Sequence, residues 1–453
     1  ERWSGHFYNW YNTQSLEVLH PRYISTVDSG NLAGHLFTLR QGLLTIPNQP
    51  IVELKFFQGL QDTLRLAIHE IPAKEKELRM SLQTFHEELG LSSFLLPAVK
   101  IHFENILARL KKLTGSIEGN RIVFTEWLHA AVKQIEAIQH ELLLGAPWLF
   151  DLPVPQKYSN HKLVCEIPTL AGLSKMDREI KSELENWHKQ LNSEAEIQWL
   201  YHFEQCVHKA STQARERISA LQSLAFQCYE FTDQEYEFLY DRSHHLLAIG
   251  YTVDEHQRDA GFYDLLASEA RLGLFVAIAQ GKLPQESWFA LGRRLTTAGN
   301  TPVLLSWSGS MFEYLMPGLV MPTYQNTLLD EMCIGTVKKQ IEYGEIQEVP
   351  WGISESCYNL VDTHLTYQYK AFGIPGLGFK RGLSQDLVIA PYATVLALMI
   401  DPQAACSNLE AMRSQGFEGK YGFYEAIDFT SARLSRGQTH AVIQTFMAHH
   451  QGM

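Results

Sequence analysis

Apolar residues recur at intervals of three and four through most of residues 31–225. Stretches such as LKFFQGLQDTLRLAIHEI, FENILARLKKL and WLHAAVKQIEAIQHELLL place these residues on one face of an α-helix, with polar side chains on the other faces. Short segments that contain Pro or Gly, such as TIPNQP, separate them. The pattern predicts a run of amphipathic helices over this part of the chain.

The pattern changes from about residue 245 onward. Helical stretches such as YDLLASEARLGLFVAIAQG and DEMCIGTVKKQIEYGEI alternate with loops rich in Gly, Pro, Ser and aromatic residues, such as SWSGSMFEYLMP, QEVPWGISESCYN and KAFGIPGLGFKRG. This alternation predicts helical hairpins whose long loops gather at one mouth, where functional sites tend to lie. About ten to twelve helices are expected in the chain, which is enough for an all-α toroid, and no fixed repeat indicates a solenoid.

Composition and charge narrow the class of protein. The 453 residues are 45% hydrophobic and carry a net charge of -12, which argues against a nucleic-acid partner because phosphates need a basic surface. The six cysteines form no CxxC pair, so neither a disulfide framework nor a zinc site is indicated, and a reducing compartment is expected. The longest apolar run, LVIAPYATVLALMI, contains a Pro and is too short to span a bilayer.

The late loops combine aromatic residues with acids. Sugar rings stack on aromatic side chains, their hydroxyls bond to carboxylates and amides, and cleavage of a glycosidic bond needs two carboxyl groups. A carbohydrate site is one interpretation of this mixture, and aromatic packing is the other.

Two acids stand out by their surroundings. Glu269 lies in a strongly apolar helical stretch, where a carboxylate is costly unless it is paired or functional. Its alternative role is an ion pair with Arg271 or Arg258. Glu355 lies in VPWGISESCYN, a stretch that favours a turn. Its alternative roles are a solvated turn residue or a helix cap.

Other polar residues leave further alternatives open. Glu313 could contact a ligand but is more simply a partner of neighbouring loop amides, and Glu425 and Asp428 could bond sugar hydroxyls or form caps. The adjacent His449 and His450 would point about 100° apart on a helix, which is poor geometry for one metal ion. No HExxH, GxSxG or GxGxxG motif is present, so neither a metal nor a cofactor is expected.

Eight long motifs resemble a known family. They include FYDLLASEARL, LLSWSGSMFEYLMP, VPWGISESCYN, YQYKAFGIPGLGFKRGL, GFYEAIDFT and FMAHHQGM, and they closely resemble the middle, glycoamylase-like region of cyclic β-1,2-glucan synthases. The resemblance runs from Gly5 to Met453 and is looser over about 50–230. It implies that residues 1–453 form a single (α/α)6 barrel, with 1–30 as an N-terminal extension packed on the barrel.

The resemblance also implies an activity. Such a domain would be a retaining transglycosylase that cuts linear β-1,2-glucan internally, holds the glycosyl unit covalently and passes it to the chain's own non-reducing end. Glu269 and Glu355 match the family's catalytic carboxylates, with Glu355 as nucleophile and Glu269 as general acid/base, acting through a substrate hydroxyl. The alternatives are an inverting endo-β-1,2-glucanase and a non-catalytic glucan-binding domain.

Substrate contacts and context are expected on the same basis. The predicted binding set consists of stacking platforms and hydroxyl partners: Asp264, Trp307, Glu313, Tyr314, Trp351, Tyr367, Tyr369, Glu425, His449 and His450. In the family this region follows a membrane-embedded glycosyltransferase and precedes a phosphorylase-like region, so the chain resembles a soluble domain excised from a larger synthase. Its expected partners are linear β-1,2-glucan and those two domains, and its expected place is the cytoplasmic side of the bacterial inner membrane.

Overall fold

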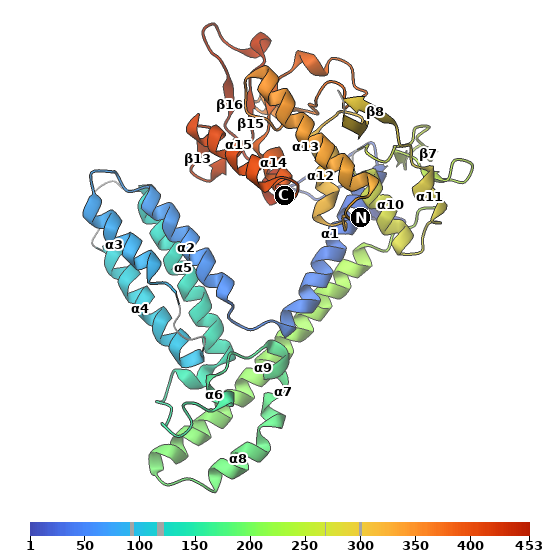
Figure 1. Ribbon diagram of the computed structural model, residues 1–453. Coiled ribbons are helices and arrows are strands. Elements are labelled where there is room, and N and C mark those ends of the chain that lie inside the picture. Colours follow the sequence, from blue (N-terminus) through green and yellow to red (C-terminus); the bar gives the residue numbers. More distant parts are fainter. Residues whose placement is uncertain (91–94, 116–121, 268, 299–300) are drawn as a thin grey trace. The chain divides into compact units, whose positions relative to one another are not determined.

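The computed structural model describes residues 1–90, 95–115, 122–267, 269–298 and 301–453. The chain divides into two compact units, one made of residues 40–227 and the other of residues 1–39 and 228–453 (Figure 1). We call the first the helical unit and the second the loop-rich unit. The boundaries fall within α1 (Thr26–Thr45) and close to the end of α9 (Glu194–Phe231).

The helical unit is built from the amphipathic helices that the sequence predicts. On α2, the buried residues Phe57, Leu60 and Leu64 recur at the helical spacing. The helices α2 and α4 both pack against α5, and the ring of Phe57 stacks on that of Phe103 at 5.0 Å between centroids. Its helices besides α9 are α2 (Leu54–His69), α3 (Lys76–Glu87), α4 (Leu96–Gly115), α5 (Ile122–Gly145), α6 (Lys162–Cys165), α7 (Leu170–Glu179) and α8 (Lys181–His188).

The loop-rich unit has shorter helices and a core of its own. Buried residues such as Met311, Leu377 and Ile427 belong to one apolar cluster that extends through this unit. Its helices besides α1 are α10 (Ala270–Ala279), α11 (Glu286–Ala290), α12 (Met311–Leu315), α13 (Leu328–Gln347), α14 (Pro391–Leu396), α15 (Pro402–Ser414) and α16 (Ala448–Gly452).

Short antiparallel strands decorate the loops of this unit, which the sequence did not predict. One three-stranded sheet has the order β3 (Tyr23–Ser25), β6 (Gly250–Thr252) and β7 (Gln257–Arg258). The other has the order β12 (Val388–Ile389), β15 (Ala426–Asp428) and β16 (Ala441–Ile443). The hairpins are β1 (Arg2–Trp3) with β2 (His6–Phe7), β4 (Tyr240–Asp241) with β5 (Leu246–Leu247), β8 (Leu295–Ala298) with β9 (Thr301–Leu304), β10 (Ser356–Val361) with β11 (Tyr367–Lys370), and β13 (Glu418–Gly419) with β14 (Gly422–Phe423).

The predicted helical class is confirmed, because helices make up most of the helical unit and the strands of the loop-rich unit are short (Figure 1). Closure of six hairpins into one barrel stays a prediction, as does a single domain over 1–453. The N-terminal residues pair with the loop-rich unit through β3 and β6, where Ile24 lies opposite Tyr251. No helix in the described ranges combines the length and the apolar character needed to cross a bilayer.

Candidate active site

Glu269 lies at the start of α10, at the N-cap position. Its backbone carbonyl accepts hydrogen bonds from the amides of Leu272 at 3.0 Å and Gly273 at 3.1 Å. Its side chain is buried, as the apolar sequence of this stretch predicts. The first turn of a helix is electrostatically favourable for an anion, so the fold itself supports a carboxylate here.

A close approach of α1 to α10 brings a second polar residue to Glu269. A Cβ atom at Gly30 would lie 2.2 Å from the Cα atom of Gly273, so only glycine allows this contact. One position along α1, the Asn31 amide donates to Oε1 of Glu269 at 3.5 Å. The structure thus adds Asn31, which the sequence did not single out, to the surroundings of Glu269.

The arginines proposed as ion-pair partners of Glu269 bond elsewhere. The guanidinium of Arg258 pairs with Asp241 at 2.8 Å. The buried Arg271 donates to the backbone carbonyls of Glu313 and Tyr314. Arg271 therefore stabilises the backbone of α12, and Arg258 is paired with a residue of β4.

The loop that carries Glu355 is fixed by side-chain hydrogen bonds. The amide group of Gln340 bonds both the N–H and the carbonyl of Ile353, each at 2.8 Å. The hydroxyls of Ser354 and Tyr392 bond each other at 2.7 Å, and the Tyr392 hydroxyl also lies 3.0 Å from the Glu355 carbonyl. Such bonds hold Glu355 in one position without a regular helix or strand.

A glycine and the following strand decide the conformation of Glu355. Gly352 has a φ of +124°, and a Cβ there would lie 2.8 Å from the Thr394 hydroxyl. Strand β10 begins at Ser356, directly after Glu355, so the helix-cap alternative is wrong. Glu355 is also partly buried, which is not the environment of a solvated turn residue.

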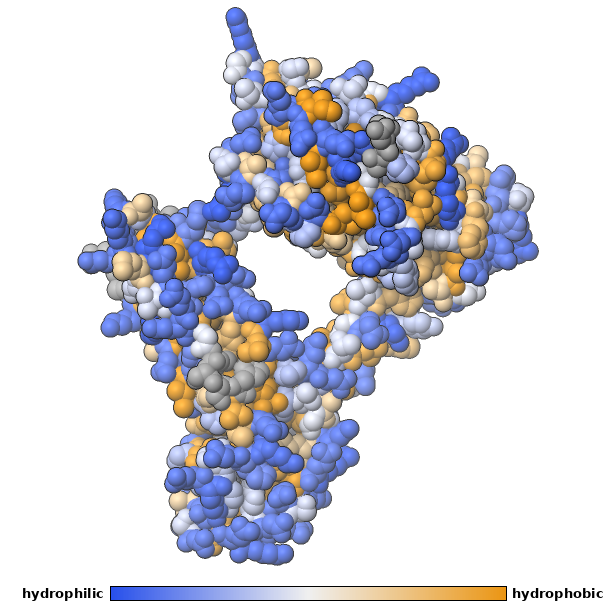
Figure 2. Space-filling model, in the orientation of Figure 1, coloured by the Kyte–Doolittle hydropathy of each residue, from blue (hydrophilic) through white to orange (hydrophobic). Residues whose placement is uncertain are grey.

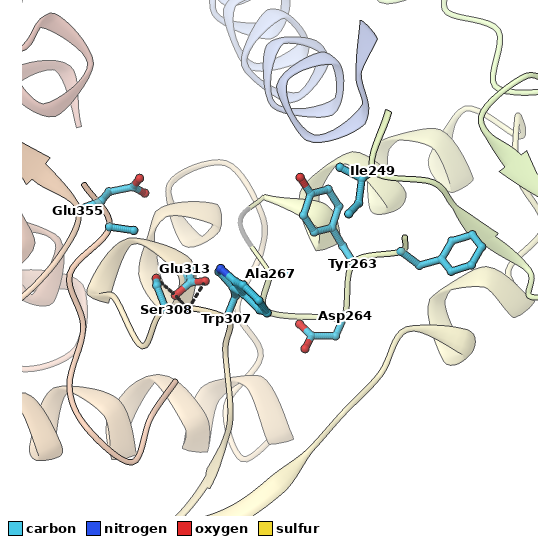
Figure 3. Close-up of a pocket in the computed structure, with 10 residues that line it drawn as sticks. Ile249, Tyr263, Asp264, Ala267, Trp307, Ser308, Glu313 and Glu355 are labelled. Atoms are coloured by element: carbon cyan, nitrogen blue, oxygen red, sulfur yellow. Dashed lines mark hydrogen bonds between the residues drawn. The ribbon is translucent and has the colours of Figure 1, made fainter. Parts of the chain in front are cut away.

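Glu355 lines a cavity of about 440 Å³ (Figure 3). Asp264, Glu313 and Trp307 line the same cavity, together with Ala267, two positions before Glu269. Figure 3 shows the carboxyl groups of Glu355, Glu313 and Asp264 distributed around the indole of Trp307. The cavity therefore combines several acids with an exposed aromatic ring, as a carbohydrate site requires.

The electrostatics of the cavity favour a proton on one of its acids. Burial, followed by the negative charge of Glu269 and a smaller contribution from Glu313, raises the pKa of Glu355 to about 7. The Tyr369 hydroxyl, which bonds the Glu355 carboxyl, and the Lys380 ammonium act in the opposite direction on this pKa. The charge of Glu269 thus contributes to the raised pKa of Glu355.

Strand register places Tyr369 beside Glu355. In the β10–β11 hairpin Tyr369 lies opposite Cys357, two residues after Glu355, and side chains at this spacing share a face. Tyr369 is 41% exposed, and its hydroxyl interacts with the Glu355 carboxyl. Burial and the charge of Glu355 raise the pKa of Tyr369, which keeps the hydroxyl protonated.

Glu425 and His450, which were predicted to contact sugar, are buried groups. Oε1 of Glu425 lies 2.8 Å from Nδ1 of His450 and accepts the Cys357 amide at 3.3 Å, and both side chains are fully enclosed. Asp428 is likewise enclosed and pairs with Arg433 at 2.7 Å. None of these buried side chains reaches a sugar in the cavity.

Tyr314 and Trp351, also predicted as substrate contacts, are enclosed in the core of this unit. Tyr314 is completely buried, and its hydroxyl lies 2.9 Å from the carbonyls of both Leu304 and Leu377. Trp351 is 7% exposed and belongs to the apolar core, so its ring offers no face to a ligand. Position in an aromatic-rich loop does not separate such core residues from exposed ones.

Glu313 has the structural role that its sequence context favours. Its Oε2 accepts from the hydroxyls of Ser306 at 2.8 Å, Ser308 at 2.6 Å and Ser310 at 3.1 Å, and it closes a capping box at the start of α12. The three serines of SWSGS are therefore organised around this carboxylate. Direct contact of Glu313 with a sugar stays a prediction.

The remaining candidates differ in their access to the cavity. Trp307 lines it and is 62% exposed, and Asp264 lines it with a pKa raised by burial. Tyr367 lies on β11 but is not among the cavity-lining residues, and His449 is exposed beside His450, with 4.0 Å between ring centroids. Their contacts with substrate remain predictions.

Two further residues near the acids were missed by sequence reasoning. Tyr263 lines the cavity, and burial raises its pKa to about 12, with the charges of Asp28 and Glu269 adding to the effect. Lys380 lies near Glu355, and its ammonium donates to the Ala371 carbonyl at 2.7 Å. Both lie inside motifs quoted for the family resemblance, which was the available signal.

Part of the chain matches a known family. Residues 261–453, which contain Glu269, Glu355 and the cavity loops, match the Glycoamylase family, described as a putative glucoamylase.

The whole chain is similar to one stretch of a much larger protein. It is 36% identical over 462 aligned residues to the cyclic beta-(1,2)-glucan synthase NdvB of Rhizobium meliloti (strain 1021). The alignment covers 100% of this chain and 14% of the relative. The resemblance to cyclic β-1,2-glucan synthases is therefore confirmed over the full length, and the chain spans about a seventh of that relative.

Two solved structures are weakly similar. Both are of the endo-beta-1,2-glucanase of Talaromyces funiculosus. A mutant with beta-1,2-glucan gives a TM-score of 0.39 at 12% identity over 97% of this chain and 76% of that chain. The enzyme with sophorose gives 0.37 at 12% identity over 81% and 68%. At this level of similarity they place no residue in the site.

Proposed function

We propose that this chain cleaves linear β-1,2-glucan internally and closes the enzyme-bound segment into a ring, as a retaining transglycosylase. The observation that carries the proposal is the pair Glu269 and Glu355, which act on each other electrostatically beside a cavity that contains an exposed tryptophan. The name of the relative that matches the whole chain supports β-1,2-glucan as the substrate class.

The proposed reaction has two steps. Ionised Glu355 attacks the anomeric carbon while protonated Glu269 gives its proton to the departing glycosidic oxygen, directly or through a substrate hydroxyl. The result is a glycosyl ester on Glu355 and a free reducing-end fragment. In the second step Glu269 takes the proton from a hydroxyl at the non-reducing end of the same glucan, and that oxygen displaces Glu355.

Surrounding groups support these roles. The Tyr369 hydroxyl and the Lys380 ammonium favour the ionised form of Glu355, and the Asn31 amide bonds Glu269. Transfer to a sugar in place of water requires an acceptor held close to the ester. In this proposal Trp307 stacks on a sugar ring and Asp264 bonds its hydroxyls at the cavity wall.

The cellular context is part of the proposal. The chain would act within a larger synthase, between a glycosyltransferase region that supplies linear glucan and a phosphorylase-like region. The site would face the cytoplasmic side of the bacterial inner membrane.

Product analysis on linear β-1,2-glucan tests the reaction class. We expect products that resist an exo-β-glucosidase and give no NMR signal from a new reducing end. New reducing ends of inverted configuration would show the hydrolytic alternative, and unchanged turnover in Glu269→Gln and Glu355→Gln would contradict catalysis by this pair.

The division of roles needs a separate experiment. In Glu269→Gln, rapid acid quenching followed by peptide mass spectrometry should find a glucan ester on the peptide that contains Glu355. An ester on any other peptide would reverse or remove the assigned nucleophile.

A further inference from the structure

A chain of polar side chains leads from Glu355 into the interior of the protein. The Tyr369 hydroxyl interacts with the Glu355 carboxyl and lowers its pKa, and it lies 3.5 Å from Nε2 of His450. Nδ1 of His450 lies 2.8 Å from Oε1 of Glu425. Four titratable side chains are thus connected in the order Glu355, Tyr369, His450 and Glu425.

The inner half of this chain is costly to bury without a function. His450 is 3% exposed and Glu425 is 2% exposed, and neither lines the cavity. Oε2 of Glu425 is buried without a hydrogen-bond partner. A buried carboxylate and imidazole with an unsatisfied oxygen stabilise a fold less well than an apolar pair of similar size, which points to a chemical role.

Counting protons shows that the chain has two complete arrangements. An ionised Glu425 only accepts, so Nδ1 of His450 carries a hydrogen. In one arrangement a protonated Glu355 donates to Tyr369, and Tyr369 donates to Nε2 of neutral His450. In the other an imidazolium His450 donates from Nε2 to Tyr369, and Tyr369 donates to the Glu355 carboxylate. Both arrangements contain the same number of protons.

We propose that Tyr369 and His450 form a proton relay that removes the proton from Glu355 before it attacks the sugar, with Glu425 stabilising the charge on His450. The Glu355 proton passes to the Tyr369 oxygen as the Tyr369 proton passes to Nε2 of His450. Glu355 becomes a carboxylate and His450 an imidazolium, and nothing enters or leaves. The inference rests on the proposed function, because only a nucleophile must lose this proton.

The pKa of Glu355 makes such a relay useful. At about 7, this pKa leaves the carboxyl mostly protonated in mildly acidic solution, where a nucleophile would be inactive. His450, acting as a base at the other end of this series of side chains, makes the Glu355 carboxylate available without release of a proton to solvent. His450 and Tyr369 are therefore positioning residues for Glu355 in this scheme, and Glu425 is their counter-charge.

Other groups near His450 do not interrupt the relay. The Tyr392 ring stacks on His450 at 3.8 Å, but its hydroxyl bonds Ser354 and the Glu355 carbonyl. Burial lowers the pKa of the neighbouring His449, and its proximity to His450 adds to this effect. Burial raises the pKa of Cys357 to about 11, so its thiol stays neutral.

Charged groups farther along the chain act on Glu355. They are the acids Glu269 and Glu313, which raise the Glu355 pKa, and Lys380, which lowers it. They are unchanged by substitution of His450. The pH dependence of a His450 variant therefore reports the relay itself.

The pH dependence of kcat for glucan turnover tests the relay. His450→Gln retains a polar side chain but cannot hold the proton, so the ratio of wild-type to variant kcat should grow about tenfold per pH unit below 7 and level off above pH 8. Tyr369→Phe should shift the acidic limb in the same direction. His364→Gln, at the exposed turn of the same hairpin, should follow wild type at every pH. A ratio for His450→Gln that is constant with pH would overturn the relay.

A second measurement does not need turnover. NMR of the protein with ¹³C-labelled glutamate carboxyls, with the Glu355 signal assigned by its loss in Glu355→Gln, gives the titration midpoint of this group. The midpoint should be higher in His450→Gln than in wild type, and an equal midpoint would overturn the relay. A raised midpoint in a protein that leaves β-1,2-glucan unchanged would support the relay and contradict the proposed function.

Discussion

The two units of the chain bury different kinds of side chain. Among the described residues of the helical unit, Thr63 and Ser211 are the only polar side chains that are buried. Each has a hydrogen-bond partner: the Thr63 hydroxyl donates to the Gly59 carbonyl at 3.0 Å, and the Ser211 hydroxyl accepts from the Asp177 amide at 3.2 Å. The loop-rich unit buries charged groups as well: Glu269, Arg271, Glu313, Glu425, Asp428 and His450.

The difference suggests that the helical unit mainly provides stability and the loop-rich unit mainly provides the groups for chemistry. The helical unit gains its free energy of folding from apolar burial along regular helices, and its ion pairs, such as Arg217 with Glu141, lie at the surface. The loop-rich unit encloses charged groups with hydrogen-bond partners, which orders loops around a cavity but contributes less to stability. Substitutions in the two units should therefore change different measurements.

The largest expected effect is on turnover when either acid of the pair is neutralised. Glu269→Gln and Glu355→Gln should each lower kcat by roughly 10³-fold or more, because each removes a group that acts at the transition state. Initial rates of glucan cleavage give the result, with circular dichroism to verify folding.

A matched control comes from the helical unit. Glu141→Gln makes the same chemical change in a side chain that pairs with Arg217 at 2.6 Å near the surface. Its turnover should stay within about twofold of wild type, since such a pair is worth at most about 1 kcal/mol of stability. A loss comparable to that of Glu355→Gln would erase the distinction between the units.

The next largest effect is on stability in the helical unit. Phe103 is fully buried and stacks on Phe57 at 5.0 Å, so Phe103→Ala should lower the free energy of unfolding by about 4 kcal/mol. Urea denaturation measures this loss. The kcat of the folded fraction should not change, and a large fall in kcat would show that the helical unit also shapes the site.

The sequence predicts the helical unit more completely than the loop-rich unit for a physical reason. Helices such as α2 and α5 bury one apolar stripe, and the three- and four-residue spacing reports that stripe directly. The strands of the loop-rich unit, such as Val388–Ile389, are too short to show alternation. Their pairing comes from tertiary contacts, which local pattern does not contain.

The sequence indicated which types of residue belong to the candidate site, but it did not indicate where each residue lies in the folded protein. The apolar surroundings of Glu269 correctly indicated a buried acid. Asn31, 238 positions away, reaches it only through the glycine contact between α1 and α10. His450 and Glu425 look like surface sugar partners in sequence, and only the fold reveals that they are enclosed.

The buried acid of the site should itself reduce stability in a pH-dependent way. The pKa of Glu355 in the folded protein, about 7, exceeds the ordinary 4.5, so the unfolded chain releases this proton first and stability falls as pH rises from 4.5 to 7. Glu355→Gln removes this cost, so its effect on the free energy of unfolding should be more favourable at pH 8 than at pH 4 by roughly 3 kcal/mol. Urea denaturation at the two pH values measures it, and equal effects would mean that Glu355 is ordinarily solvated.

The smallest predicted effect is on the KM for glucan when Trp307, an exposed aromatic residue at the cavity, is replaced. Trp307 is held at the cavity wall because its carbonyl accepts the Lys380 amide at 3.0 Å, while Gly373 and Gly378 leave space for the backbone of Ser308. Trp307→Ala should raise the KM for glucan about five- to tenfold with little change in kcat, since it removes stacking worth about 1 kcal/mol, and Trp307→Phe should restore most of the affinity.

The control for Trp307 is Tyr201→Ala in the helical unit. Tyr201 is 63% exposed, against 62% for Trp307, but it lies on α9 and lines no cavity described here. Its loss should leave KM unchanged, because exposure alone gives a sugar no second wall to contact. An equal rise in KM for both variants would mean that glucan binds along the helical unit as well, and the separation of stability from chemistry would then fail for substrate binding.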